Sequence, residues 1–508
     1  IWNKNLKTHA KIITIIIVAT LFITCSTNTP YATSIPKQKF RRSASQQVAF
    51  QIDNLLNNAP TQMAWWGVKV QYANTGKVIY ERNASKMFLP ASNVKMYTTA
   101  AALCLLGPEY RYGTDFVTNG TLDNGILKGD LIIRGSGDPT WSERFYDSNY
   151  DSVMVCFVDS LKALGISEIN GKIIGDDNVF DDLHWGAGWM WDDEYEWHYA
   201  ELSGLSFNEN YIDYTLIPDS STIGNPVIIE PLLKTSYINL RNDMVTVGSK
   251  AEEDWRYGRN HSTNDCWFEG DYSIQSGVDE ADLTIHNPTL FTAHVLKEYL
   301  LDAGIKVNGN PVDADDLIDS IDYEQTSILF TYISHPMSRG IAEANQPSSN
   351  HIAETLQKTL GNELGEGGTS KEGLKIQMAF YDSLGMDVEN LYLRDGSGLS
   401  RYNLVSPSNS TSLLQVMWDH DYRDDFVKSF PIAGVIGSID DRMMGSNAVG
   451  SVHAKTGNMT NVSSLSGYAW TKSGEPMIFS IMVNNHMTGN SKVKPLQDKI
   501  AIILSDME

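Results

Sequence analysis

The chain has 508 residues, a length that suggests two to four domains rather than one. Its hydrophobic content of 42% and charged content of 20% are those of a globular protein with a sizeable core. A formal net charge of −23 argues against a nucleic-acid partner, because no excess of lysine and arginine is present to neutralise phosphates. The acidity fits either solubility or a substrate that carries amines, and composition does not choose between them.

The N-terminal segment has the pattern of an export signal. Three lysines precede an apolar run over residues 12–23, which is the length of a signal-peptide core and short for a membrane span. We therefore expect residues 1–32 to be a signal peptide. Two forms of processing stay open: ordinary cleavage near residue 32, or a lipoprotein leader with Cys25 as the lipidated residue. Only lipidation at Cys25 would associate the protein with a membrane.

Hydrophobic periodicity and turn residues predict helices and strands along the rest of the chain. The predicted helices cover residues 45–56, 94–106, 151–164, 288–303, 351–356 and 496–505. The predicted strands cover residues 65–71, 77–81, 465–470 and 476–483, and residues 205–285 have a strand-and-turn texture without helical periodicity. Cys104, Cys156 and Cys266 are far apart and have no spacing typical of a metal site or a disulfide framework.

A candidate nucleophile lies at the start of the second predicted helix. Ser92 and Lys95 form a Ser-x-x-Lys motif, and Lys95 lies one turn later on the same side as the Ser92 hydroxyl. A serine beside a neutral lysine is an activated nucleophile. The alternative is a serine that caps a core helix with an exposed lysine nearby. The motif also occurs at Ser34 and Ser491, where Pro36 and Pro495 argue against a helix that presents the pair.

Two further candidate motifs follow later in the chain. Ser348-Ser349-Asn350 is a Ser-x-Asn motif that adjoins a predicted helix, and Lys455-Thr456-Gly457 occurs once in the chain. Each motif alone is weak, but the three in this order form a specific set.

With these motifs the chain resembles the penicillin-recognising serine DD-peptidases. It is most similar to the D-alanyl-D-alanine carboxypeptidase/endopeptidase group of low-molecular-mass, class C penicillin-binding proteins, which have large inserted domains. The resemblance extends over residues 45–490 and includes, besides the three motifs, the segments 135–139, 205–210 and 395–400. The long separation of Ser92 from Ser348 leaves room for one or two domains, whereas a class A β-lactamase has a short connection there.

The resemblance implies an α+β fold of the penicillin-binding/β-lactamase-like transpeptidase type. Its antiparallel sheet, flanked by helices, would come from residues 45–112 and 325–508. Residues 113–324 would form mainly-β inserted domains, with about 209–283 as a candidate third, nested domain.

The resemblance also implies a serine DD-peptidase that cleaves peptidoglycan stem peptides through an acyl-enzyme and is acylated by β-lactams. Catalytic roles carry over to Ser92, Lys95, Ser348, Asn350 and Lys455. Substrate-binding roles carry over to Thr456, Gly457 and Asn458, and to a pocket for the amine-bearing end of diaminopimelate that consists of Asp192, Trp189, Trp197, Arg401 and Met459. Asp192 could instead be an ordinary turn residue.

No metal or organic cofactor is implied, and the expected location is the periplasm or cell envelope. Two alternatives remain for the function. One is a β-lactamase or esterase of the same fold, and the other is a non-catalytic protein that binds the cell wall.

Overall fold

The computed structural model describes residues 43–61 and 63–508. The predicted signal peptide, Cys25 and the Ser34 motif therefore lie outside the described residues. Within the described ranges, no helix is both long enough and apolar enough to cross a membrane. Cys104, Cys156 and Cys266 are free thiols.

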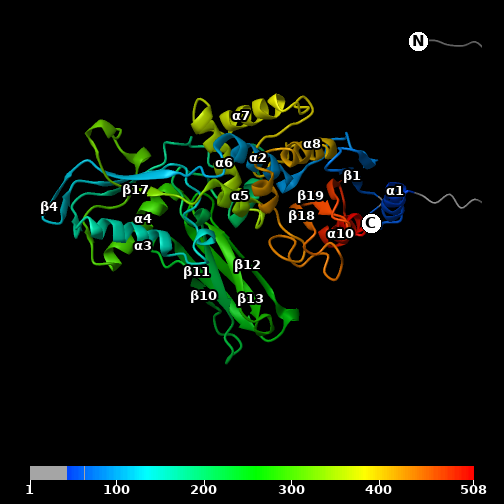
Figure 1. Ribbon diagram of the computed structural model, residues 1–508. Coiled ribbons are helices and arrows are strands. Elements are labelled where there is room, and N and C mark those ends of the chain that lie inside the picture. Colours follow the sequence, from blue (N-terminus) through cyan, green and yellow to red (C-terminus); the bar gives the residue numbers. More distant parts are fainter. Residues whose placement is uncertain (1–42, 62) are drawn as a thin grey trace, which may run out of the picture. The chain divides into compact units, whose positions relative to one another are not determined.

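A five-stranded antiparallel sheet joins the two ends of the chain (Figure 1). Its spatial order is β18-β19-β20-β1-β2, so strands distant in sequence lie side by side. The bounds are β1 Trp65–Tyr72, β2 Val78–Arg82, β18 Val452–Met459, β19 Val462–Trp470 and β20 Pro476–Asn484. All nine residues of β20 are buried, because helices cover both faces of the sheet. β18 lies at an edge, so one row of its backbone groups is not paired within the sheet.

Two groups of helices form the cores on either side of this sheet. On one face pack α1 Ala44–Asn57 and α10 Asn490–Ser505. On the other face lie α2 Val94–Leu106, α5 Met337–Asn345, α6 Asn350–Leu364, α7 Ser370–Ser383, α8 Pro407–Trp418 and α9 Arg423–Lys428. Lys95 is the second residue of α2, and Ser92 lies in the turn just before this helix, so the candidate nucleophile adjoins the second core.

The middle of the chain forms four further sheets and two helices around one apolar core. Their orders are β16-β8-β6-β3-β17, β15-β7-β5-β4, β10-β9-β14 and β11-β13-β12. The helices are α3 Ser152–Ala163 and α4 Pro288–Asp302. The first two sheets are built from β3 Gly113–Thr118, β4 Thr121–Asp123, β5 Ile126–Lys128, β6 Leu131–Arg134, β7 Glu168–Ile169, β8 Ile173–Asp176, β15 Lys306–Val307, β16 Val312–Asp313 and β17 Ser327–Ile333. The other two are built from β9 Tyr211–Ile217, β10 Ile228–Pro231, β11 Asn239–Val247, β12 Asp254–Arg259, β13 Asp265–Ser273 and β14 Asp279–Thr284.

These elements confirm the predicted α+β class and the predicted helices and strands, with two corrections. The sequence placed Lys494 outside a helix because Pro495 follows it, and this was wrong: α10 begins at Asn490 and continues through Pro495. Near a helix start, proline removes only a single backbone hydrogen bond, which the rest of the helix tolerates. The second correction concerns α2, for which Val94, Tyr97, Ala101, Cys104 and Leu105 predict a single apolar face. Residues 94–103 are buried on all sides.

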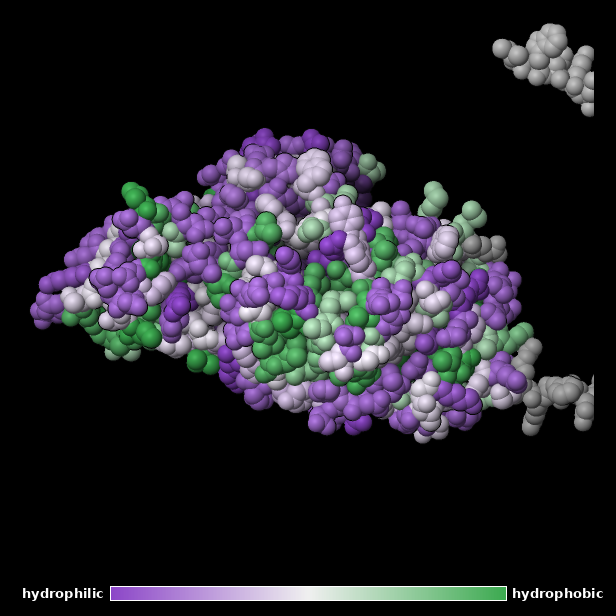
Figure 2. Space-filling model, turned by 90° about the horizontal axis from the view of Figure 1, so that it is seen from above, coloured by the Kyte–Doolittle hydropathy of each residue, from purple (hydrophilic) through white to green (hydrophobic). Residues whose placement is uncertain are grey.

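Hydrophilic side chains cover most of the face in Figure 2, and hydrophobic ones gather in its middle part. This distribution fits a chain with a large negative net charge, because charged side chains favour contact with water. Three polar residues of the sequence motifs, Lys95, Asn350 and Lys455, are in contrast buried.

Candidate active site

Ser92 lies in a 3₁₀ turn, Ala91–Asn93, that leads directly into α2. Lys95 is fully buried, and its Nζ lies 3.1 Å from Ser92 Oγ. The same nitrogen donates to Asn350 Oδ1 at 2.5 Å and to the Ser397 carbonyl oxygen at 2.9 Å. The capping alternative predicted an exposed lysine near Ser92. Lys95 is instead buried, and its amine lies within hydrogen-bond reach of the Ser92 hydroxyl.

Burial also changes the protonation of Lys95. Removing the ammonium from water lowers the pKa of Lys95 to about 7, while the negative charges of Glu354 and Asp395 act in the opposite direction. Near neutral pH a large fraction of this amine is therefore unprotonated. An unprotonated lysine within hydrogen-bond reach of a serine can accept the hydroxyl proton.

The Ser-x-Asn motif meets Lys95 at the start of α6. Ser349 caps this helix, and its Oγ accepts a hydrogen bond from the Ile352 N–H at 3.2 Å. Ser348 has a positive φ of 73°, which is unusual for a residue with a side chain. Lys455 Nζ donates to Ser348 Oγ at 2.7 Å. This contact joins the second motif to the third.

The Lys-Thr-Gly motif lies on the edge strand β18, next to the Ser92 turn. Asn93 Nδ2 donates to the Lys455 carbonyl oxygen at 2.9 Å and fixes the strand on the turn. A Cβ on Gly457 would lie 2.7 Å from Pro90 O and 3.0 Å from Ser92 N, so the close approach requires glycine. Burial, and then the neighbouring Lys95, lower the pKa of Lys455 well below its usual value.

These groups surround one cavity of about 230 Å³. The predicted site residues that line it are Ser92, Ser348, Asn350, Thr456, Gly457, Asn458, Trp197 and Met459. The cavity walls also include His198, Pro347, Gly398, Leu399 and Ser438. Lys95 and Lys455 lie behind this lining, where they bond to Ser92 and Ser348.

Three residues of the predicted amine pocket do not line this cavity. The Trp189 indole donates to Asp395 Oδ2 at 3.0 Å and lines a separate hollow of about 170 Å³ with Trp185 and Trp191. Asp192 is exposed, and Arg401 is half-buried. Their proposed role depends on a substrate that extends beyond the cavity around Ser92.

Sequence reasoning missed four residues that contact the site. His198 lines the cavity, and its backbone carbonyl oxygen accepts from Asn350 Nδ2 at 2.7 Å. Ser438 Oγ lies 2.8 Å from Thr456 Oγ1. Glu354 follows Asn350 by one helical turn, a spacing that could have identified it. Asp395 belongs to the segment 395–400 that forms part of the resemblance, but the sequence assigned it no role.

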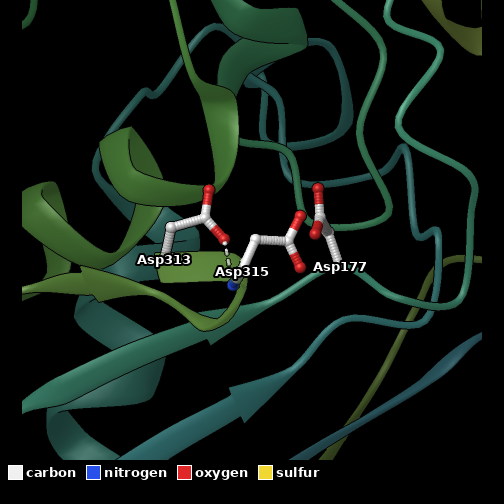
Figure 3. A group of neighbouring side chains, drawn as sticks. All are labelled: Asp177, Asp313 and Asp315. Carbon is white, nitrogen blue, oxygen red and sulfur yellow. Dashed lines mark hydrogen bonds between the residues drawn. The ribbon is translucent and has the colours of Figure 1, made fainter. Parts of the chain in front are cut away.

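One group of carboxylates in the described ranges is close enough to share a cation: Asp177, Asp313 and Asp315 (Figure 3). Asp313 Oδ2 already accepts from Asn287 Nδ2 at 2.9 Å, and Asp177 Oδ2 accepts from Thr289 Oγ1 at 2.6 Å. Burial raises the pKa of Asp313 to about 6. We assign no ion to this group, because its buried oxygens are served by protein donors.

Comparison with known proteins gives consistent matches along nearly the whole chain. The sequence model of the D-Ala-D-Ala carboxypeptidase 3 (S13) family matches residues 48–507. A D-alanyl-D-alanine carboxypeptidase of Actinomadura sp. (strain R39) is 30% identical over 90% of this chain and 84% of its own length. The D-alanyl-D-alanine carboxypeptidase DacB of Haemophilus influenzae is 26% identical over 83% of this chain and 85% of its own.

A solved structure shows the same fold. The crystal structure of penicillin binding protein 4 (DacB) from Haemophilus influenzae superposes with a TM-score of 0.76 at 24% identity. The match covers 89% of this chain and 99% of the other. The sheets formed by the middle of the chain are therefore part of the shared fold.

Proposed function

The chain belongs to the S13 family of D-Ala-D-Ala carboxypeptidases and is a serine-type carboxypeptidase, and from this premise we propose that it cleaves peptidoglycan stem peptides through an acyl-enzyme on Ser92. The observation that carries the proposal is the meeting of three distant motifs around one cavity. The contacts are Lys95 with Ser92 and Asn350, and Lys455 with Ser348.

In the proposed acylation step, neutral Lys95 takes the Ser92 proton while Oγ attacks the carbonyl carbon between two D-alanines. The carbonyl oxygen becomes negative and would be held by the backbone N–H groups of Ser92 and Asn458. Each such donor contributes about 3 kcal/mol to the transition state. The C–N bond then breaks, and the departing amine needs a proton.

We assign delivery of that proton to Ser348, which accepts a hydrogen bond from Lys455. Ser348 gives its hydroxyl proton to the amine and receives in exchange the proton that Lys95 took from Ser92, so Lys95 is neutral again before deacylation. The terminal carboxylate of the substrate would meet Lys455 and Thr456. Because β18 is an edge strand, its unpaired backbone groups can bond to an extended peptide laid beside it. Water then attacks the acyl-enzyme, with Lys95 again as the base, and releases the shortened peptide and free Ser92.

The same steps explain the expected reaction with β-lactams. Ser92 Oγ bonds to the lactam carbonyl carbon, the ring C–N bond breaks, and the nitrogen takes the proton. The amine stays tethered to the acyl group, so it does not leave the site. A solved structure of the Haemophilus relative is complexed with a β-lactam, which supports this part of the proposal. A stem-peptide crosslink contains the same type of amide bond, so endopeptidase activity belongs to the proposal as well.

The proposed substrate also indicates where the enzyme is located in the cell. Peptidoglycan lies outside the cytoplasmic membrane, so we propose an exported enzyme of the periplasm or cell envelope. Lipidation at Cys25 would add a membrane anchor, and palmitate labelling of the full chain in cells would detect it.

The test is intact-mass spectrometry after incubation with benzylpenicillin. The wild type should gain one long-lived adduct, and Ser92→Ala should gain none. Ser491→Ala is the matched control, because Ser491 belongs to a Ser-x-x-Lys sequence on the exposed part of α10. An adduct that persists on Ser92→Ala would overturn the assignment of the nucleophile.

The same assay separates the alternatives. Rapid penicillin turnover without a lasting adduct would identify a β-lactamase or esterase. No reaction with penicillin, combined with binding to cell-wall material, would identify a non-catalytic binding protein.

A further inference from the structure

The catalytic domain contains a fully buried carboxyl group that the proposed mechanism does not use. Glu354 lies on α6 with no exposed surface. Its Oε1 accepts hydrogen bonds from the Gly396 N–H at 3.0 Å and the Ser397 N–H at 2.7 Å. Its Oε2 is buried and has no hydrogen-bond partner within the described part of the chain. A buried, half-satisfied carboxyl group is costly for a fold and calls for an explanation.

The segment that Glu354 holds is the one that holds Lys95. The Ser397 carbonyl oxygen accepts from Lys95 Nζ, and the Ser397 N–H on the same residue donates to Glu354. Thr98 Oγ1 donates to the Gly396 carbonyl oxygen at 2.7 Å and fixes the same turn on α2. A chain of hydrogen bonds therefore connects Glu354 with Lys95 through a single residue, Ser397.

We propose that Glu354 is a positioning residue that presents the Ser397 carbonyl to Lys95 and sets the pH at which Lys95 becomes free to accept the Ser92 proton. The inference deepens the proposed function, on which it rests. The two parts of the role are separable. The hydrogen bonds that Oε1 accepts depend on the length of the side chain, whereas the effect on the protonation of Lys95 depends on its negative charge.

The charge acts in a defined direction. A negative Glu354 favours the protonated form of Lys95 and so raises the pKa of Lys95 above the value that burial alone would give. Burial, and then the negative charge of Asp395, raise the pKa of Glu354 to about 7. Lys455 on β18 and His198 from the inserted region are the other titratable groups that interact with Lys95. The surroundings of Lys95 thus contain two carboxyl groups and two basic groups.

Two variants of the same residue separate charge from reach. Glu354→Gln keeps a carbonyl oxygen at the Oε1 position and loses the charge. The acid limb of its benzylpenicillin acylation profile should move to lower pH by at least 0.5 pH unit, because Lys95 loses its proton more easily without the negative charge. The plateau rate should stay within about threefold of the wild-type rate. Glu354→Asp keeps the charge but is too short to reach both N–H groups. Its rate should fall at least tenfold at every pH without a shift of the limb.

Glu363→Gln is the matched control, because Glu363 lies exposed on the same helix and its Oε1 accepts from Asn362. It should reproduce the wild-type profile. Stopped-flow acylation from pH 5 to 9 measures all four proteins, and circular dichroism confirms that each is folded. If Glu354→Gln does not fold, the Glu354→Asp profile decides, and a wild-type rate there overturns the proposal.

A profile of Glu354→Gln that superposes on the wild type, or that falls equally at all pH values, would also overturn it. A wild type that is not acylated at all would instead contradict the proposed function. The two failures are therefore distinguishable.

Discussion

Two residues of one aromatic and acidic segment, Trp197 and His198, line the cavity. His198 lines the cavity beside Trp197, and Asn350 holds the His198 carbonyl. Burial lowers the pKa of His198, while the nearby Asp193 carboxylate acts in the opposite direction. Asp193 also raises the pKa of Tyr199, as burial does more strongly. Asp193 is thus coupled to the cavity wall, although the sequence pointed to its neighbour Asp192.

This neighbouring pair defines a prediction about substrate choice. Asp192→Asn should lower kcat/KM at least about tenfold on peptides with a free diaminopimelyl end, because an ammonium loses its counter-charge, worth about 1.4 kcal/mol. Acylation by benzylpenicillin should barely change, since that molecule has no such amine. Steady-state kinetics on both substrates makes the measurement.

Asp193→Asn is the matched control for that prediction. A selective loss in Asp193→Asn alone would move the amine site to Asp193. Parallel losses of peptide and penicillin activity in Asp192→Asn would assign Asp192 to support of the fold.

At the scale of elements, the site depends on three backbone segments packed more closely than side chains allow. The edge strand β18 approaches the Ser92 turn at Gly457. The loop that carries Ser397 approaches the same turn at Gly398, whose φ is +93°. A Cβ on Gly398 would lie 2.0 Å from the Ala91 carbonyl oxygen and 3.0 Å from Ser92 N. The position of Ser92 is therefore set by backbone contact from both sides.

This contact predicts the effect of adding one methyl group. Gly398→Ala should lower the benzylpenicillin acylation rate at least about tenfold, because the Ala91 carbonyl must move and Ser92 moves with it. Stopped-flow acylation measures the rate, and the thermal midpoint measures stability.

Gly385→Ala is the control for this prediction. Gly385 also has a positive φ of 74°, but the described residues place no atom within 4 Å of its Cβ position. It should cost about 1 kcal/mol of stability and leave acylation unchanged. Equal effects of both substitutions on acylation would contradict the contact argument.

At the scale of the whole molecule, the middle of the chain packs against the Ser-x-Asn motif. Ser349 Oγ donates to the buried carboxylate of Glu209, which also pairs with Arg144. His351 follows Asn350 in α6, and its Nε2 lies 3.2 Å from Ser206 Oγ. The segment 205–210, which the sequence analysis included in the resemblance, is therefore packed against the start of α6. Glu209 and Ser206 of this segment thus contact the two residues that flank Asn350.

This junction predicts a pH dependence of stability. Burial lowers the pKa of His351 to about 4, against a usual value of about 6.5. The unfolded chain therefore binds a proton below pH 6.5 that the folded chain does not bind until about pH 4. The native state should lose about 3 kcal/mol from this residue as the pH falls through that interval.

His351→Gln removes the titrating group and keeps a polar side chain. The decrease in unfolding free energy between pH 7 and pH 4 should become smaller by about 3 kcal/mol. Urea unfolding followed by tryptophan fluorescence at both pH values tests this. Parallel pH dependence in variant and wild type would show that His351 does not bind the extra proton on unfolding.

The sequence by itself determined the order of the three motifs and most elements, because local periodicity and turn residues depend on near neighbours. The α+β class followed from the family resemblance that these motifs carry. It identified Ser92 and Lys95 because their spacing lies within one helical turn. Tertiary structure alone decided the environment of Lys95: the Ser397 carbonyl, the charge of Asp395 and the edge position of β18 come from segments hundreds of residues away. It also placed Trp189 on Asp395 rather than in the cavity wall. Burial and long-range contacts set protonation and orientation, and neither is encoded in the spacing of a motif.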